Sequence, residues 1–210
     1  MSDTIDTILT QMGQDSARIA ENVPKVFEAG QKSEYDRFWD AYQDNGERTN
    51  YEYAFGGAGW TQDLFNPKYS FLKVRSPYMM FMSSKIETIP AIEFDSRATY
   101  SDIFKNATLL KTIEKLTFSD IIGATFNRVF QSCTSLENLT IGGEIAQNGF
   151  DVSWSTKLTH DSLMSIINAL ADKSEDTSGT IWTVTLGETN IAKLTDEEIN
   201  IATQKGWVLG

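Results

Sequence analysis

The residues of this chain that could take part in covalent chemistry are few. His160 is the only histidine among the 210 residues, and Cys133 is the only cysteine. Any serine–histidine or cysteine–histidine pair would therefore have to include one or both of them. His160 falls in the first turn of a predicted helix, where an exposed polar side chain needs no catalytic explanation. We therefore predict no catalytic residue, and we interpret the protein as one that is not an enzyme.

A single cysteine also restricts redox and metal chemistry. It allows no disulfide bond within the chain and no cysteine-rich metal site. Cys133 occupies the small-residue position of a repeated motif that is described below. A buried cysteine at such a position behaves as a small apolar side chain. We therefore interpret Cys133 as a space-filling residue of the core and not as a nucleophile.

Other segments have spacings that resemble metal or phosphate sites. Asp36, Asp40 and Asp44 recur every four residues, which a solvated acidic helix face explains. Residues 172–183 resemble a calcium-binding loop, but the sixth position is not glycine and the twelfth is not glutamate. The glycine-rich run 56–59 lacks the spacing of a phosphate-binding loop. We therefore predict neither a metal nor a cofactor.

The charge of the chain limits its partners. It has 18 basic and 29 acidic residues, which gives a net charge of −11. This acidity argues against nucleic acid, because a basic face supplies most of the affinity for phosphates. It argues equally against docking on anionic lipid, and no apolar stretch approaches the ~18 residues of a membrane span. The first residues carry no basic region followed by an apolar run, so we predict no signal peptide.

A sequence pattern occurs three times between Met79 and Ile141, and we expect the structural elements that would position a site to be organised around it. Each copy has a large apolar residue, a small residue three positions later, and leucine or isoleucine after three more. We assign the small positions to Ser83, Ala107 and Cys133. Shifts of 24 and 26 residues superimpose the copies. The pairs aligned by the first shift are Met80 with Phe104, Ile89 with Ile113, Ile92 with Leu116 and Phe94 with Phe118.

A period of this length is typical of leucine-rich repeats, which recur every ~20–29 residues. One copy cannot bury its apolar face alone, so neighbouring copies must stack and share a core. The sequence therefore predicts an α/β fold, a leucine-rich-repeat solenoid of short strands joined by loops or helices. We divide the chain into an N-terminal helix at 1–30, a helical and loop cap at 31–78, and the repeat domain at 79–210.

The N-terminal helix has apolar residues at a seven-residue spacing, which favours a coiled coil. In this interpretation it trimerises and attaches the protein to a larger assembly. The alternative is an amphipathic helix that folds back on its own domain. The residues assigned to oligomerisation are Ile5, Ile8, Met12, Ile19 and Val26.

The segments on either side of the repeats have clear local signals. Residues 33–44 predict a helix with one aromatic face, which we expect to cover the open end of the solenoid. Beyond the repeats, Thr159 predicts the cap of a helix over 160–173. Residues 181–186 alternate between apolar and polar side chains over most of their length, which is typical of a strand. A capping box at 195–198 predicts a last helix, followed by a short final strand.

The repeats and their flanks carry a resemblance to known proteins. The run Phe130-Gln-Ser-Cys-Thr-Ser-Leu-Glu-Asn-Leu-Thr-Ile resembles the Phe-x-x-Cys-x-x-Leu-x-x-Ile-x-Ile unit of BspA-like leucine-rich repeats. The flanking segments 35–60 and 154–170 resemble leucine-rich-repeat proteins that phages and prophages encode. The resemblance implies a virion or tail-associated component, made in the host cytoplasm, that binds other virion proteins or a host-surface protein or glycan.

Two other functions remain open at this point. A bacterial cell-surface adhesin could use the same repeats, although it would be expected to carry an export signal. A glycan-degrading tail-spike enzyme would need a pair of carboxylates, which can lie far apart in a sequence. In each case we expect the exposed strand surface to contact the partner. The candidate binding residues are Glu87, Thr88, Lys111, Thr112, Glu114, Glu137, Asn138, Thr140, Trp182 and Thr183.

Overall fold

The computed structural model describes residues 53–63, 65, 71–74, 77–94, 100–118 and 126–210. The predicted coiled coil, with Ile5, Ile8, Met12, Ile19 and Val26, lies outside these residues, as does the aromatic helix of the predicted cap. The described elements are β1 (Phe71–Val74), β2 (Thr88–Ile89), β3 (Ile92–Phe94), β4 (Tyr100–Ser101), β5 (Thr112–Phe118), β6 (Phe126–Asn127), β7 (Asn138–Gly143), α4 (His160–Ala169), β8 (Trp182–Val184), α5 (Glu188–Ile191), α6 (Asp196–Gln204) and β9 (Trp207–Leu209).

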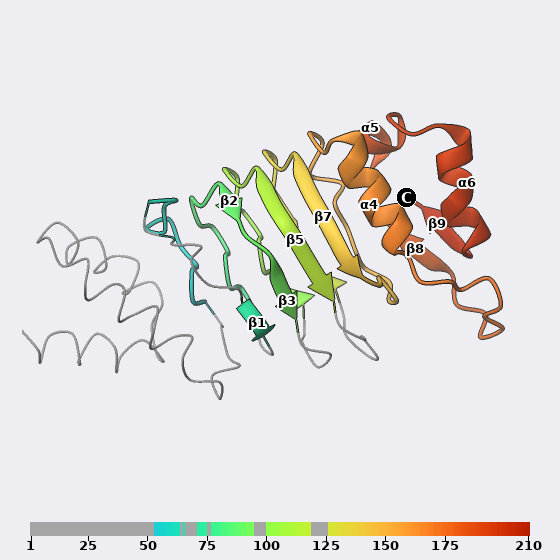
Figure 1. Ribbon diagram of the computed structural model, residues 1–210, viewed down its shortest axis with the longest axis horizontal. Helices are drawn as coiled ribbons and strands as arrows, with labels where there is room; N and C mark the ends of the chain where they lie inside the picture. Colours follow the sequence, from blue (N-terminus) through green and yellow to red (C-terminus); the bar gives the residue numbers. More distant parts are fainter. Residues whose placement is uncertain (1–52, 64, 66–70, 75–76, 95–99, 119–125) are drawn as a thin grey trace, which may run out of the picture.

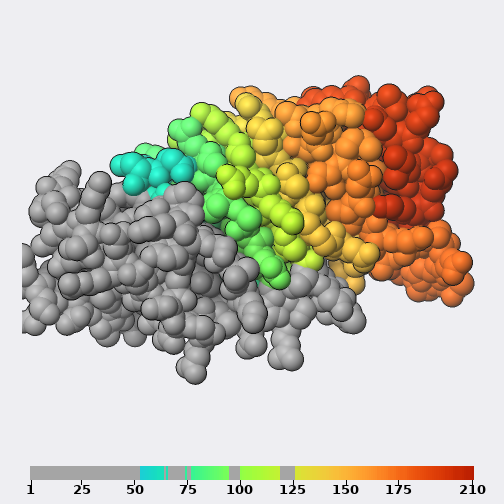
Figure 2. Space-filling model, viewed as in Figure 1, coloured from blue at the N-terminus to red at the C-terminus, as the bar shows by residue number. Residues whose placement is uncertain are grey.

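The largest sheet of the described chain has five short strands that pair in parallel. Strands β1, β3, β5 and β7 lie side by side in chain order, and the helices gather at the C-terminal end (Figure 1). In the space-filling view, the segments that carry these strands form successive bands across the molecule (Figure 2). Strands β2 and β3 both pair with β5 and are separated by Pro90 and Ala91. Proline has no backbone N–H to donate, so it interrupts the ladder at this point.

The strand register matches the shifts that superimpose the copies of the pattern. The three strand pairs predicted by the 24-residue shift are confirmed. They join Ile89 to Ile113, Ile92 to Leu116 and Phe94 to Phe118. Strand β7 pairs with β5 at an offset of 26 at Thr112 and Ile113, and the register then slips by one residue. Two residues of β5 oppose one of β7 there, which is a β-bulge.

A row of stacked phenylalanine rings fills the interior beside the tight turns. The ring centroids of Phe55 and Phe81 are 5.2 Å apart, those of Phe81 and Phe104 are 5.4 Å apart, and those of Phe104 and Phe130 are 5.4 Å apart. All four rings are fully buried. Phe55 comes from the segment predicted as part of the cap, so that segment packs directly on the first repeat.

The turn of the first repeat differs from the predicted alignment by one residue. Phe81, and not Met80, stacks on Phe104, and the buried small residue is Ser84 in place of Ser83. Ser83 instead has a positive φ. In the first copy, one residue separates the buried small residue Ser84 from the next apolar residue, Ile86, whereas two residues separate Ala107 from Leu110 in the second copy. The 24-residue shift that aligns the strands therefore places the turn of the first copy one residue too early. The equivalent turn bonds run from Ser84 N to Phe81 O, from Ala107 N to Phe104 O and from Cys133 N to Phe130 O.

A buried ion pair joins two neighbouring turns. Asp102 is fully buried at a positive φ, and its carboxylate accepts a 2.8 Å hydrogen bond from Arg128 Nη2. Lys105 Nζ lies 3.2 Å from the other carboxylate oxygen. A buried carboxylate is costly unless it is paired, and these two cations offset the cost of burying Asp102.

The edge of β7 is covered by a helix and not by another strand. Helix α4 places two serine hydroxyls against the backbone of β7. Ser162 Oγ accepts a hydrogen bond from Leu139 N and donates one to Glu137 O, at 2.9 and 3.1 Å. Ser165 Oγ accepts from Ile141 N at 2.8 Å. These hydroxyls take the place of strand backbone and satisfy an edge that would otherwise be unpaired.

The two predicted helix caps are confirmed. Thr159 Oγ1 accepts a hydrogen bond from Ser162 N, and Thr195 forms a reciprocal capping box with Glu198. Helix α4 ends at Ala169 and not at residue 173, as predicted. The reason is that Leu170 becomes extended and forms a parallel bridge with Ile145. No helix of the described chain is long and apolar enough to cross a membrane.

The serine contacts of α4 give the first prediction. Ser162→Ala leaves the buried Leu139 N–H without its acceptor, which costs about 1–3 kcal/mol of unfolding free energy. Urea denaturation measures this loss, and amide hydrogen exchange should show faster exchange at Leu139. Ser174→Ala, in an exposed loop, is the control and should change stability by less than about 0.5 kcal/mol. Unchanged exchange at Leu139 would show that another group satisfies this amide.

Candidate binding surface

Eight of the ten predicted binding residues lie together on the outward side of the parallel strands. We call this set the strand face. It consists of Glu87, Thr88, Lys111, Thr112, Glu114, Glu137, Asn138 and Thr140. In β7, Asn138 and Thr140 are exposed while Leu139 and Ile141 are buried. This alternation sends one set of side chains to the core and the other to solvent.

The strand face is arranged in rows that cross the strands. Glu87, Lys111 and Glu137 form the first row, because Lys111 N donates to Glu87 O and Glu137 N donates to Lys111 O, at 2.8 and 2.9 Å. The second row contains Thr88, Thr112 and Asn138, which are paired through their Cα positions. The rows hold these side chains at the spacing of neighbouring strands, about 4.8 Å.

The third row lies at the β-bulge. Glu114 and Lys115 of β5 oppose Thr140 of β7, and all three side chains are exposed. The bulge therefore places two charged side chains next to each other at the centre of the strand face. The 26-residue shift did not predict the bulge, because it aligns the copies only as far as Ile113 and Leu139, and Leu116 then pairs with Ile141 at an offset of 25.

One lysine of the strand face is held by its neighbours. Lys111 Nζ lies 2.7 Å from Glu87 Oε2. This hydrogen bond, the charge of Glu87 and the charge of Glu137 together raise the pKa of Lys111. Glu114 and Glu137 form no ion pair with any residue that the structure describes. The strand face therefore has one lysine whose positive charge is paired with a carboxylate, and two carboxylates that form no ion pair with a described residue.

Trp182 and Thr183 are not part of the strand face. They lie in β8, which pairs with β9 in a separate two-stranded sheet. Because α4 occupies the edge of β7, β8 has no place beside it. The Trp182 ring contacts Trp207 at 5.7 Å between centroids and has Lys173 Nζ 4.3 Å from its centre. Its Nε1 donates to Asp176. A shallow pocket is lined by this ring and by Asp172, Lys173, Ser174, Glu175, Asp176, Ser178 and Thr180.

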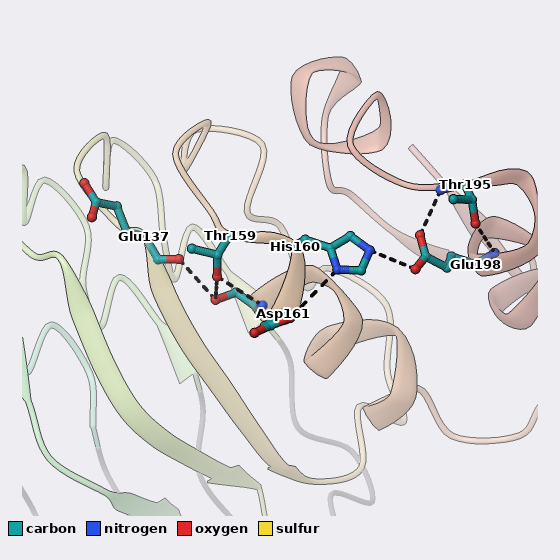
Figure 3. Close-up of polar contacts among 7 residues, drawn as sticks. Glu137, Thr159, His160, Asp161, Thr195 and Glu198 are labelled. Atoms are coloured by element: carbon teal, nitrogen blue, oxygen red, sulfur yellow. Dashed lines mark hydrogen bonds and ion pairs between the residues drawn. The ribbon is translucent and has the colours of Figure 1, made fainter.

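His160, the first residue of α4, contacts Glu198 of α6. Its Nε2 atom lies 2.8 Å from Glu198 Oε1, and Glu198 Oε2 accepts a hydrogen bond from Thr195 N at 2.8 Å (Figure 3). The Thr195 hydrogen bond, followed by His160, lowers the pKa of Glu198. The contact between His160 and Glu198 therefore links α4 to α6. The sequence identified the capping box but gave no signal for this contact between residues 38 positions apart.

Cys133 is buried against the neighbouring turn. Its Sγ donates a hydrogen bond to Phe104 O at 3.0 Å, and burial raises the pKa of the thiol to about 12. The thiol therefore stays protonated near neutral pH and contributes packing, in agreement with its interpretation as a space-filling residue. Among the described residues, no three histidine, cysteine, aspartate or glutamate side chains are grouped so that they could hold a metal ion.

Comparison of the chain with protein-family models, with curated proteins and with solved structures gives no match. The function therefore has to be inferred from the strand face itself and from the resemblance of the repeats.

The capping contact of Glu198 generates a pH prediction. Because the folded protein lowers the pKa of this carboxyl below its ordinary value of 4.5, its stabilisation is present above that pH. The stabilisation is lost as the pH falls through the folded-state pKa. Glu198→Gln should therefore lower the melting temperature at pH 7, and the difference from the unchanged protein should be smaller at pH 3 than at pH 7. Glu197→Gln, in the same turn, is the control. An equal deficit at both pH values would rule out the ionised carboxylate as the cause.

Proposed function

We propose that this chain is a leucine-rich-repeat binding protein of the kind that phages and prophages encode, and that the strand face is its partner-binding surface. The repeat length supports the class. Strands that pair at offsets of 24 and 26 residues fall within the period of ~20–29 residues that leucine-rich repeats have. The Phe-x-x-Cys-x-x-Leu motif beginning at Phe130 supports the narrower resemblance.

The observation that carries the binding role is the uncovered side of the parallel sheet. Parallel sheets are ordinarily covered on both faces and have apolar side chains on both. Here the inner face is apolar, whereas Glu114, Glu137, Asn138 and Thr140 remain exposed on the outer face. A rigid, solvent-facing row of polar groups is the kind of extended surface that stacked repeats use to bind partners.

The place of this protein in a virion, and its attachment through an N-terminal trimeric stalk, belong to the same proposal. They rest on the resemblance and on the seven-residue spacing of apolar residues in segment 1–30. In this arrangement, the stalk joins the protein to other virion proteins. The strand face then contacts either a host-surface molecule or a neighbouring virion protein.

Location in the virion can be tested directly. Particles released by the cells that carry the gene are purified and labelled with gold-conjugated antibody against residues 126–210. We expect label on intact particles and none on particles from cells in which the gene is deleted. Antigen that remains entirely with the cell envelope would favour the adhesin function and contradict this proposal.

The binding role is tested by filling the strand face without changing its charge. Asn138→Tyr with Thr140→Tyr places two bulky side chains on β7, and the labelled protein should then adsorb to host cells at least tenfold more weakly. If the partner is another virion protein, the amount of the variant that remains in purified particles is measured instead. Asn200→Tyr with Gln204→Tyr, on the exposed side of α6, is the matched control. If both pairs behave alike, or if neither reduces binding, the strand face is not the binding surface.

A further inference from the structure

The charges on the outward side of the sheet are unequal. Among the side chains that the structure describes on this side, four are carboxylates, from Glu87, Glu93, Glu114 and Glu137, and two are ammonium groups, from Lys111 and Lys115, a difference of two negative charges. Glu93 belongs to this side because it is exposed between two buried residues of β3. The excess has the same sign as the net charge of −11 for the whole chain.

The two lysines do not cancel the carboxylates. Lys111 is already paired with Glu87 at 2.7 Å and offers little charge to a partner. Lys115 lies across the sheet towards β7, since a side chain added at Gly142 would come within 2.6 Å of Lys115 Cε. Glu93, Glu114 and Glu137 form no ion pair with any residue that the structure describes. Three free carboxylates therefore face solvent on one rigid surface.

The groups between these carboxylates are short and hydrogen-bonding. They are the hydroxyls of Thr88, Thr112 and Thr140 and the amide of Asn138. No aromatic ring lies on the strand face. The one aromatic residue predicted there, Trp182, lies in another sheet with Lys173 over its ring. Sugar rings are usually bound by stacking on aromatic side chains, so the strand face lacks the group that a neutral glycan needs.

We propose that the partner of the strand face is a protein surface rich in lysine or arginine. This inference rests on the proposed binding role of the strand face. Anionic glycans and nucleic acid are repelled by the free carboxylates, and neutral glycans find no ring to stack on. A cationic protein surface meets the carboxylates of Glu93, Glu114 and Glu137 with charge-assisted hydrogen bonds. The threonine and asparagine side chains pair with polar groups between the charges.

The test uses a synthetic twelve-residue peptide of alternating lysine and serine as the cationic probe. The comparison probes are the matching glutamate–serine peptide and maltoheptaose, and affinity is measured by fluorescence anisotropy or calorimetry. We expect only the lysine peptide to bind, and to bind more weakly at higher salt. Glu114→Gln with Glu137→Gln should weaken binding about fivefold. The control, Glu175→Gln with Glu188→Gln, removes the same charge elsewhere and should change binding less than about twofold.

The outcomes separate this inference from the binding role itself. Equal losses in the two pairs would mean that the peptide senses only net charge, and the inference would be overturned. Binding of maltoheptaose that Asn138→Tyr with Thr140→Tyr abolishes would replace the cationic protein with a neutral glycan. If those tyrosines abolish adsorption but the lysine peptide does not bind, the binding role stands and the inference fails. If adsorption survives the tyrosines, the binding role fails whatever the peptide does.

Discussion

Every parallel strand in this protein has two edges of backbone N–H and C=O groups that must be satisfied. Strand β5 meets this requirement with β2 and β3 on one edge and β7 on the other. Strand β7 meets it with the hydroxyls of Ser162 and Ser165 from α4. Because an unpaired buried backbone group costs about as much as a lost hydrogen bond, these hydroxyls stabilise the end of the row of strands at β7. The two serines thereby set the limit of the strand face.

The spacing of the strands is set by the packing of aromatic rings as well as by hydrogen bonds. Phe55, Phe81, Phe104 and Phe130 stack at 5.2 to 5.4 Å between centroids on the turn side. On the opposite side, the Tyr100 ring contacts both Phe118 and Phe126 at 5.2 Å, which joins the sheet of β5 to the pair β4–β6. Rings of this size tolerate little displacement, so the strands between them form a rigid platform.

Rigidity of this kind supports the proposed binding role of the strand face. Its side chains project from strands whose inner faces are packed, so binding a partner would cost little backbone conformational entropy. The ion pair between Lys111 and Glu87 orders part of the surface in advance. In the proposed complex, the carboxylates of Glu114 and Glu137 would set the sign of the long-range attraction to a partner.

The sequence alone determined the register of β2 and β3 against β5, the caps at Thr159 and Thr195 and the packing role of Cys133. These features depend on neighbours a few residues away or on a repeat that returns the same residue types at a fixed spacing. Only the tertiary structure decided the one-residue offset that puts Phe81 in the stack, the end of α4 and the separation of Trp182 from the strand face. It also decided the contact between His160 and Glu198. These features arise where segments distant in the chain compete for the same space or hydrogen bond, and no local pattern records which segment takes it.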